Sequence, residues 1–216
     1  MGENAEEGLI LDQSKEHWES VYQKKSPKEV SWFQEIPSKS LEFIELSGVG
    51  KDAKIIDVGG GASLLVYFLI KKGFANVTVL DISLKSLEES KRQLGAQAAF
   101  VKWIEADITK TDLPHQSFDF WHDRAVFHFL TNPEDRAKYI TLLNQSLKPG
   151  GFFLIATFSL SGPPKCSGLD VCHYSAETLS RELGSNFKLI AQAEEKHKTP
   201  FNTVQDFVYC LFKKEK

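Results

Sequence analysis

The sequence predicts an α/β fold, built on a doubly wound, mostly parallel seven-stranded sheet with a C-terminal antiparallel hairpin. Short apolar segments alternate with helical ones between residues 53 and 158, which is typical of helices wound onto both faces of a parallel sheet. Two long segments, 187–195 and 203–213, alternate apolar and polar residues as paired antiparallel strands do. The chain has 216 residues, of which 42% are hydrophobic. It can therefore bury the core of one domain, expected over residues 13–216.

The N-terminal part is expected to precede the sheet. Residues 1–12 are acidic and predict a disordered tail. Apolar residues at helical spacing predict a helix over 14–24, with Ser14 as its N-cap, and a second helix over 38–46.

Two segments are interpreted as covers of a ligand site. Residues 13–50 form a helical and aromatic flap, in which Tyr22 or Trp32 covers an adenine or shields a cation. Packing against the outside of the sheet is the alternative for this flap. Residues 159–174, rich in Pro, Gly and Cys, form a candidate lid loop, with a plain connector as the alternative.

The elements between these covers follow in a regular order. The expected parallel strands are 55–58, 77–81, 99–104, 118–122 and 152–158. The expected helices are 64–70, 84–94, 132–147 and 175–183. Asn132 and Pro133 form a clear helix start, and the strand over 152–158 is apolar on both faces, which predicts a central place in the sheet.

A glycine turn follows the first strand of the sheet. Residues 53–63 read Ala-Lys-Ile-Ile-Asp-Val-Gly-Gly-Gly-Ala-Ser, and an apolar helix comes next. This is the first unit of a nucleotide-binding α/β fold. Glycines let the backbone approach a ligand closely, and the helix start carries free N–H groups and partial positive charge. An anionic or carboxylate-bearing ligand is therefore favoured. The dinucleotide pattern would need a glycine where this chain has Leu64.

Acidic residues follow or end the predicted strands. Asp81 lies 20 residues after Gly61, the distance at which an acid reaches ribose hydroxyls in this fold. Asp57, Asp107 and Asp123 occupy similar places. Because ligands bind beyond the carboxyl ends of parallel strands, these carboxylates are expected to lie at one edge of the sheet.

Composition excludes several other classes. The net charge of −3 provides no basic field for nucleic acid. The three cysteines, Cys166, Cys172 and Cys210, favour a reducing compartment and cannot complete a metal site. The longest apolar stretch, 64–70, is too short to span a bilayer, and the acidic start is unlike a targeting peptide. A cytoplasmic protein without a metal or a membrane span is expected.

These residues resemble the Rossmann-like (class I) S-adenosylmethionine-dependent methyltransferases over residues 18–213. The resemblance rests on Asp57-Val58-Gly59-Gly60-Gly61-Ala62-Ser63, on Leu147-Lys148-Pro149-Gly150-Gly151, and on the terminal antiparallel hairpin. Ser63 stands where the family often has a third glycine, and its small hydroxyl side chain can donate to the carboxylate of the cofactor.

The resemblance implies S-adenosyl-L-methionine as cofactor and a role for each motif residue. Asp81 would take both ribose hydroxyls, Asp107 the adenine amino group, and Asp123 would lie near the sulfonium. Together with the two flap residues, the expected cofactor contacts are Tyr22, Trp32, Asp57, Gly59, Gly60, Gly61, Ser63, Asp81, Ile82, Asp107, Ile108 and Asp123.

The implied reaction is an in-line displacement on a carbon that a positive sulfur activates. The protein aligns donor and acceptor and excludes water, and a base is needed only if the nucleophile arrives protonated. Asp123 and His128 are the candidate catalytic residues, with His122 and His173 as further possible bases. A structural role for His128 and a cofactor-anchoring role for Asp123 are the alternatives. Arg124 would pair with an acidic acceptor, with a cofactor carboxylate, or in a plain surface ion pair.

The acceptor and two other functions stay open. An enclosed pocket would suit a small molecule, and the mildly acidic chain would suit a lysine-bearing protein. A nucleobase is less favoured, because the Asn-Pro-Pro-Tyr signature is absent. An NAD(P)-dependent oxidoreductase and a non-catalytic cofactor-binding module are the alternatives, although the first should carry a Tyr-x-x-x-Lys motif. A monomer or weak dimer is expected.

Overall fold

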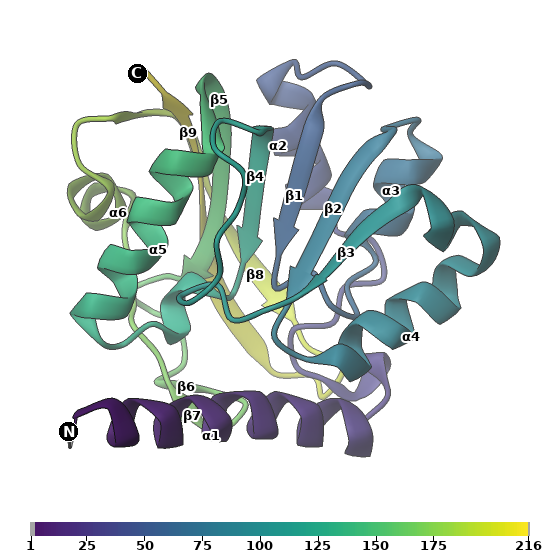
Figure 1. Ribbon diagram of the computed structural model, residues 1–216, viewed down its shortest axis with the longest axis vertical. Coiled ribbons are helices and arrows are strands. Elements are labelled where there is room, and N and C mark those ends of the chain that lie inside the picture. Colours follow the sequence, from purple (N-terminus) through teal and green to yellow (C-terminus); the bar gives the residue numbers. More distant parts are fainter. Residues whose placement is uncertain (1–2, 216) are drawn as a thin grey trace.

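The computed structural model describes residues 3–215, with side chains from residue 14 onward. Its sheet runs in the order β3-β2-β1-β4-β5-β9-β8, and β6 and β7 form a separate small ladder (Figure 1). The strands are β1 (Lys54–Val58), β2 (Asn76–Asp81), β3 (Val101–Glu105), β4 (Phe118–Arg124), β5 (Leu147–Phe158), β6 (Lys165–Cys166), β7 (Leu169–Asp170), β8 (Phe187–Lys198) and β9 (Val204–Lys214). The first five pair in parallel, whereas β9 pairs antiparallel with β5 and β8 with β9. The predicted fold class is confirmed.

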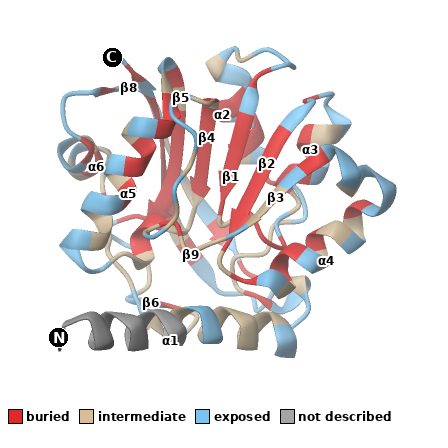
Figure 2. Ribbon diagram, in the orientation of Figure 1, coloured by how far each residue is buried: buried red, intermediate tan, exposed pale blue. Residues whose placement is uncertain are grey.

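Helices cover both faces of the sheet. They are α1 (Glu3–Lys24), η1 (Pro27–Glu29), α2 (Ser38–Ser47), α3 (Leu65–Lys71), α4 (Leu84–Leu94), η2 (Gly95–Phe100), η3 (Phe127–Phe129), α5 (Pro133–Ser146) and α6 (Ala176–Leu183). Apolar residues of α2, α3 and α4 pack into one core cluster, and those of α5 and α6 into the other. Figure 2 shows the buried strands between these layers. The winding follows from the apolar stripe that each helix carries.

Three boundaries differ from the sequence expectations. Helix α1 already begins at Glu3, so Ser14 is not its N-cap. The third strand starts at Val101 because a 3-10 helix occupies residues 95–100. The turn expected at 148–151 lies within β5, which pairs with β4 from Leu147 across a register irregularity. The disordered tail predicted at 1–12 falls on residues 1–2, outside the described residues, and on a part of α1 without described side chains, so it stays a prediction.

Helix α1 crosses the carboxyl ends of the parallel strands (Figure 1). Lys15 Nζ lies 2.5 Å from Glu105 Oε1 at the end of β3. Glu19 Oε1 accepts a hydrogen bond of 2.7 Å from the backbone N–H of Leu84 at the start of α4. The start of the chain thus closes over the sheet edge at which ligands of such folds bind. Within residues 3–215, no helix is long and apolar enough to cross a membrane.

Candidate functional site

Two adjoining cavities lie at the carboxyl edge of the sheet. The large cavity has about 130 Å³ and is lined by Ser14, Trp18, Tyr22, Trp32, Val58, Gly59, Leu80, Asp81, Ile82, Ala106, Asp107, Ile108, Arg124, Ala125, Val126, Phe129, Leu130 and Cys166. The small cavity has about 50 Å³ and is lined by Tyr22, Pro27, Val30, Trp32, Phe33, Gln34, Pro37, Ser40, Asp57, Gly59, Gly60, Ala62, Ser63, Leu64, Leu65, His122 and Arg124. Tyr22, Trp32, Gly59 and Arg124 belong to both, so they form the boundary between the two cavities.

The glycine turn after β1 brings the backbone close to two carboxylates. Gly59 has φ of +67°, a backbone conformation that favours glycine. A β carbon at Gly60 would collide with the carboxylate of Asp57, and one at Gly61 with that of Asp81. The glycines therefore allow the turn and its acids to share one small space at the sheet edge.

The carboxylate of Asp81 lies at the wall of the large cavity. Its Oδ1 accepts a hydrogen bond of 2.9 Å from the backbone N–H of Ser83. Burial raises the pKa of Asp81 to about 6, although hydrogen bonds from Ser83 and Gly61 act in the opposite direction. Asp107, also in the wall, accepts from the backbone and the hydroxyl of Thr109 at 2.9 and 2.8 Å. The structure thus brings together the two acids that the sequence assigned to an adenosine group.

Aromatic side chains form the other wall of the large cavity. Trp18 meets Trp32 edge-on at 5.6 Å between ring centroids and Phe129 at 5.1 Å, and Tyr22 meets Trp32 at 6.4 Å. Burial and the nearby charge of Asp81 raise the pKa of the Tyr22 hydroxyl, which stays protonated. The wall therefore consists of uncharged aromatic side chains, a kind of side chain whose π-face attracts cations.

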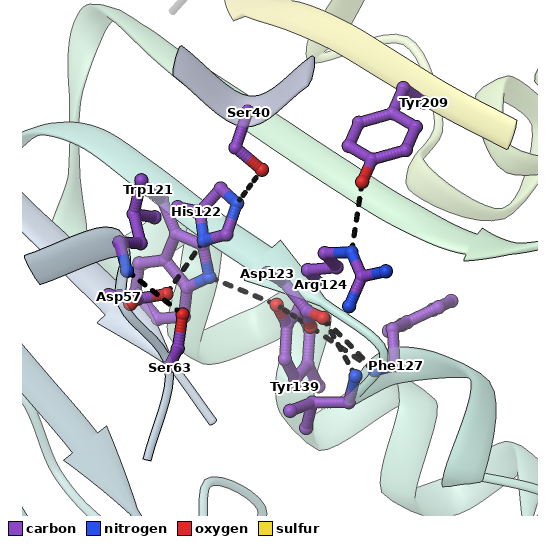
Figure 3. Close-up of polar contacts among 12 residues, drawn as sticks. Ser40, Asp57, Ser63, Trp121, His122, Asp123, Arg124, Phe127, Tyr139 and Tyr209 are labelled. Carbon is purple, nitrogen blue, oxygen red and sulfur yellow. Dashed lines mark hydrogen bonds and ion pairs between the residues drawn. The ribbon is translucent and has the colours of Figure 1, made fainter. Parts of the chain in front are cut away.

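A buried hydrogen-bonded chain lies beside the small cavity (Figure 3). His122 Nδ1 is 2.6 Å from Asp57 Oδ1, and His122 Nε2 is 2.9 Å from Ser40 Oγ. The other carboxylate oxygen of Asp57 has no hydrogen-bond partner among the described residues. Sequence reasoning considered His122 only as a base and missed Ser40, because no local pattern shows that α2 packs against the end of β4.

Asp123 requires a correction, since the structure does not bring it to the cavities. Its Oδ1 accepts from the backbone of Val126 at 2.9 Å, and its Oδ2 accepts from the hydroxyl of Tyr139 at 2.7 Å and the backbone of Phe127 at 3.2 Å (Figure 3). Tyr139 in turn accepts from Trp121 Nε1 at 2.9 Å. The carboxylate is fully buried on the α5 side, so the geometry does not support the expected position near the sulfonium.

His128 is likewise an interior residue. Its Nδ1 accepts a hydrogen bond of 3.2 Å from the backbone of Phe158, and the side chain is fully buried. Burial lowers the pKa of His128 to about 3, which keeps the imidazole neutral. Of the residues described, its neighbour Phe129 lines the large cavity and His128 does not. The structural role is the one that the geometry supports.

Arg124 takes the place at the cavities that Asp123 was expected to hold. Its Nε donates to the hydroxyl of Tyr209 at 2.9 Å, its Nη1 donates to the carbonyl of Trp32 at 3.0 Å, and the guanidinium lies 4.5 Å from the centroid of the Phe207 ring. Glu195 is 4.0 Å from Nη2, which has no hydrogen-bond partner within the described part of the chain. With 10% of the side chain exposed, Arg124 is not in a surface ion pair.

The loop after β5 contributes one side to this enclosure. Cys166 of β6 lines the large cavity, and His17 Nε2 of α1 lies 3.2 Å from the hydroxyl of Ser167. His173, a possible base in the sequence, instead bonds the carbonyl of Pro163 at 2.9 Å. The loop and α1 thus touch each other beside the large cavity.

Comparisons with known proteins show which family this chain resembles in sequence. A family model described as "Methyltransferase domain" matches residues 56–155. The chain is 25% identical to EEF1A lysine methyltransferase 2 of Danio rerio, over 83% of this chain and 77% of the relative. It is 30% identical to the ubiquinone/menaquinone biosynthesis C-methyltransferase UbiE of Coxiella burnetii, over 67% of this chain and 56% of that protein.

Solved structures share the fold. The 1,6-didemethyltoxoflavin-N1-methyltransferase of Burkholderia thailandensis, with bound S-adenosylhomocysteine, aligns with a TM-score of 0.67 at 15% identity, over all of this chain and 92% of that one. The sequence and structural matches set aside the oxidoreductase and the non-catalytic module. The chain belongs to the class I S-adenosylmethionine-dependent methyltransferases, with S-adenosyl-L-methionine as its methyl donor.

Proposed function

We propose that this enzyme methylates an amine, and that the acceptor is the side chain of a protein lysine. The observation that carries the proposal is the aromatic wall of the large cavity, which meets Arg124 at the boundary between the cavities. π-Faces stabilise positive charge, which passes from the donor to the acceptor nitrogen during transfer. This chain aligns with 77% of the length of the lysine methyltransferase of Danio rerio, but with only 56% of the length of UbiE.

The cofactor fits the residues that line the two cavities. Asp81, Ile82, Asp107 and Ile108 would hold the adenosine part in the large cavity, as the motif positions imply. The methionine part would lie in the small cavity, beside Asp57, Gly60 and Ser63. Asp57 and Arg124 line the small cavity, and each has a buried polar atom without a hydrogen-bond partner, so a ligand that carries an ammonium and a carboxylate would suit them. S-Adenosyl-L-methionine supplies a methyl group that its sulfonium activates.

The residues at the boundary explain how the amine reacts without a dedicated base. The positive charge of Arg124 favours the neutral form of a nearby amine, which is the nucleophilic form. Both ring nitrogens of His122 are hydrogen-bonded within the protein, to Asp57 and to Ser40. The amine nitrogen forms the new bond to the methyl carbon as the carbon–sulfur bond breaks, and its extra proton then leaves to solvent. The protein supplies alignment and excludes water.

A small-molecule amine is the second candidate, and the enclosure of the site favours it. Helix α1, Trp32 and Cys166 all line the large cavity, so a lysine must enter along a narrow path or after α1 moves.

For either acceptor, we propose one domain over residues 13–216, in which residues 13–50 act as the flap and residues 159–174 as the lid. The proposal also includes a monomer or weak dimer in the cytoplasm that does not act on nucleic acid, as the net charge of −3 supports.

The test is a transfer assay with tritiated S-adenosylmethionine and a desalted cell lysate. Label in acid-precipitated protein, mapped to a lysine by mass spectrometry, is the expected result. Label only in the acid-soluble fraction would shift the assignment to a small molecule. The Asp81→Ala variant is the control, because a true signal must fall with cofactor affinity. With the donor well below the dissociation constant of the wild type, a signal that this variant retains in full would come from another enzyme in the lysate.

A further inference from the structure

The hydrogen-bonded chain beside the small cavity joins three elements that are far apart in the sequence. Ser40 comes from α2, Asp57 from β1 and His122 from β4, and their exposed fractions are 0%, 1% and 3%. Period-two alternation points Asp57 and His122 to the same face of the sheet, on which α2 packs. The three side chains are therefore held by the core itself and not by a loop.

Within this hydrogen-bonded chain, the contact between His122 and Asp57 has a fixed direction. An ionised carboxylate can only accept, so His122 Nδ1 carries the hydrogen of the 2.6 Å contact to Asp57 Oδ1. The Nε2 atom and the hydroxyl of Ser40, 2.9 Å apart, are hydrogen-bonded whichever of the two carries the hydrogen. Ser40 thus holds the ring, and the ring holds one carboxylate oxygen of Asp57.

The second carboxylate oxygen of Asp57 is left without a donor. Across the described residues, Oδ2 has no hydrogen-bond partner, and a β carbon at Gly60 would collide with it. Asp57 and Gly60 both line the small cavity. A buried carboxylate oxygen without a donor is unfavourable, so a site of this kind needs a ligand with N–H groups, and a cationic one above all.

We propose that His122 and Ser40 are positioning residues that orient Asp57 to accept from the ammonium of the cofactor's methionyl group. The inference rests on the proposed placement of the methionine part in the small cavity. Neither residue touches the reacting atoms. They act on catalysis indirectly, because they orient Asp57, and Asp57 contacts only the amino group of the ligand.

Three ligands separate this role from a general contribution to the fold. S-Adenosylhomocysteine carries the ammonium, its deaminated analogue lacks only the amino group, and 5′-methylthioadenosine lacks the whole amino-acid part. Calorimetry on the purified full chain gives the affinity for each ligand. The wild type should bind S-adenosylhomocysteine about tenfold or more tightly than the deaminated analogue, as a charged hydrogen bond provides.

Variants then test the hydrogen bonds that link Ser40, His122 and Asp57. His122→Leu should lose about tenfold in affinity for S-adenosylhomocysteine and change little for the two other ligands. His122→Asn should restore most of the loss, because its amide can still donate to Asp57. Ser40→Ala should weaken the affinity for S-adenosylhomocysteine by a few-fold. The matched control Ser90→Ala, which changes a buried serine of α4, should leave this affinity unchanged.

Equal losses for all three ligands, or no loss for any, would overturn the proposal. If His122→Leu does not fold, the folded Asn and Ser40 variants decide by the same comparison. A wild type that binds the deaminated analogue as tightly as S-adenosylhomocysteine would also overturn it. Since no methyl acceptor is present in these titrations, they are independent of whether lysine proves to be the acceptor.

Discussion

Asp81 and Asp123 occupy similar places near the carboxyl ends of β2 and β4, yet they face different surroundings. Both are buried, and burial raises the pKa of each to about 6. Asp81 lies in the wall of the large cavity, whereas Asp123 holds η3 and Tyr139 on the α5 side. The end of a strand therefore brings a residue to the edge of the sheet, but the direction of its side chain decides whether it meets a ligand.

The largest effect expected from this comparison is the loss of stability in Asp123→Ala. The substitution leaves two buried N–H groups and the Tyr139 hydroxyl without their acceptor, which should cost about 3 kcal/mol of unfolding free energy. For a chain of this size the melting temperature should fall by roughly 6–12 °C. Thermal unfolding followed by circular dichroism measures the shift. Weaker cofactor binding by the folded variant would instead return Asp123 to the site.

Next comes the dependence on pH, in which stability and binding should move in opposite directions. Because both carboxyls have raised pKa values in the folded state, the folded protein binds more protons than the unfolded chain between about pH 4 and 6. Each group should therefore reduce stability as the pH rises through this window, by at most roughly 3 kcal/mol. Cofactor affinity should rise over the same window, since ionised Asp81 accepts from both ribose hydroxyls.

Denaturant unfolding and calorimetry with S-adenosylhomocysteine, from about pH 4 to pH 8, measure the two trends. Asp81→Asn should remove the rise in affinity, and Asp123→Asn should keep it. If both variants bind with the same pH profile, the two acids do not differ in the way that the structure implies.

A third prediction concerns affinity alone. Asp81→Ala should weaken the affinity for S-adenosylhomocysteine by about 10- to 100-fold. This loss corresponds to the about 1.5–3 kcal/mol that hydrogen bonds to a charged group contribute. Stability should change less than in Asp123→Ala, because Asp81 borders the large cavity, where water can take the place of its carboxylate. Calorimetry at neutral pH gives the constant, and an unchanged value would remove Asp81 from the cofactor site.

The sequence predicts which residues meet in the expected cofactor half of the site because its signals are local. The glycine turn after β1, Asp81 at the end of β2 and Asp107 after β3 all lie at or just beyond strand ends. The predicted parallel order alone brings them together. Roles for these residues stay predictions, but the cavity that they share is a finding.

The half of the site around β4 could not be predicted in the same way. Alternation along β4 places Asp123 on the face of the buried Trp121, and Arg124 with His122 on the opposite face. The alternation can be read from the sequence, but it shows which of these side chains is turned away from the cavities only once the sheet face that α5 covers is known. Ser40 had no local signal, since its contact with His122 spans 82 residues and depends on the packing of α2.

The smallest effect is expected at the cover of the site, where Glu19 fastens α1 to α4. Its carboxylate accepts from the backbone of Leu84 at 2.7 Å and of Lys85 at 3.3 Å, so it caps the start of α4 from another helix. Glu19→Ala should lower the unfolding free energy by about 1 kcal/mol, as the loss of a helix cap does. Because α1 crosses the cavity edge, S-adenosylhomocysteine should also dissociate about fivefold faster. Stopped-flow displacement measures the rate, with the exposed Glu16 of the same helix, changed to Ala, as the matched control. Equal rates in the two variants would show that α1 does not limit release of the ligand.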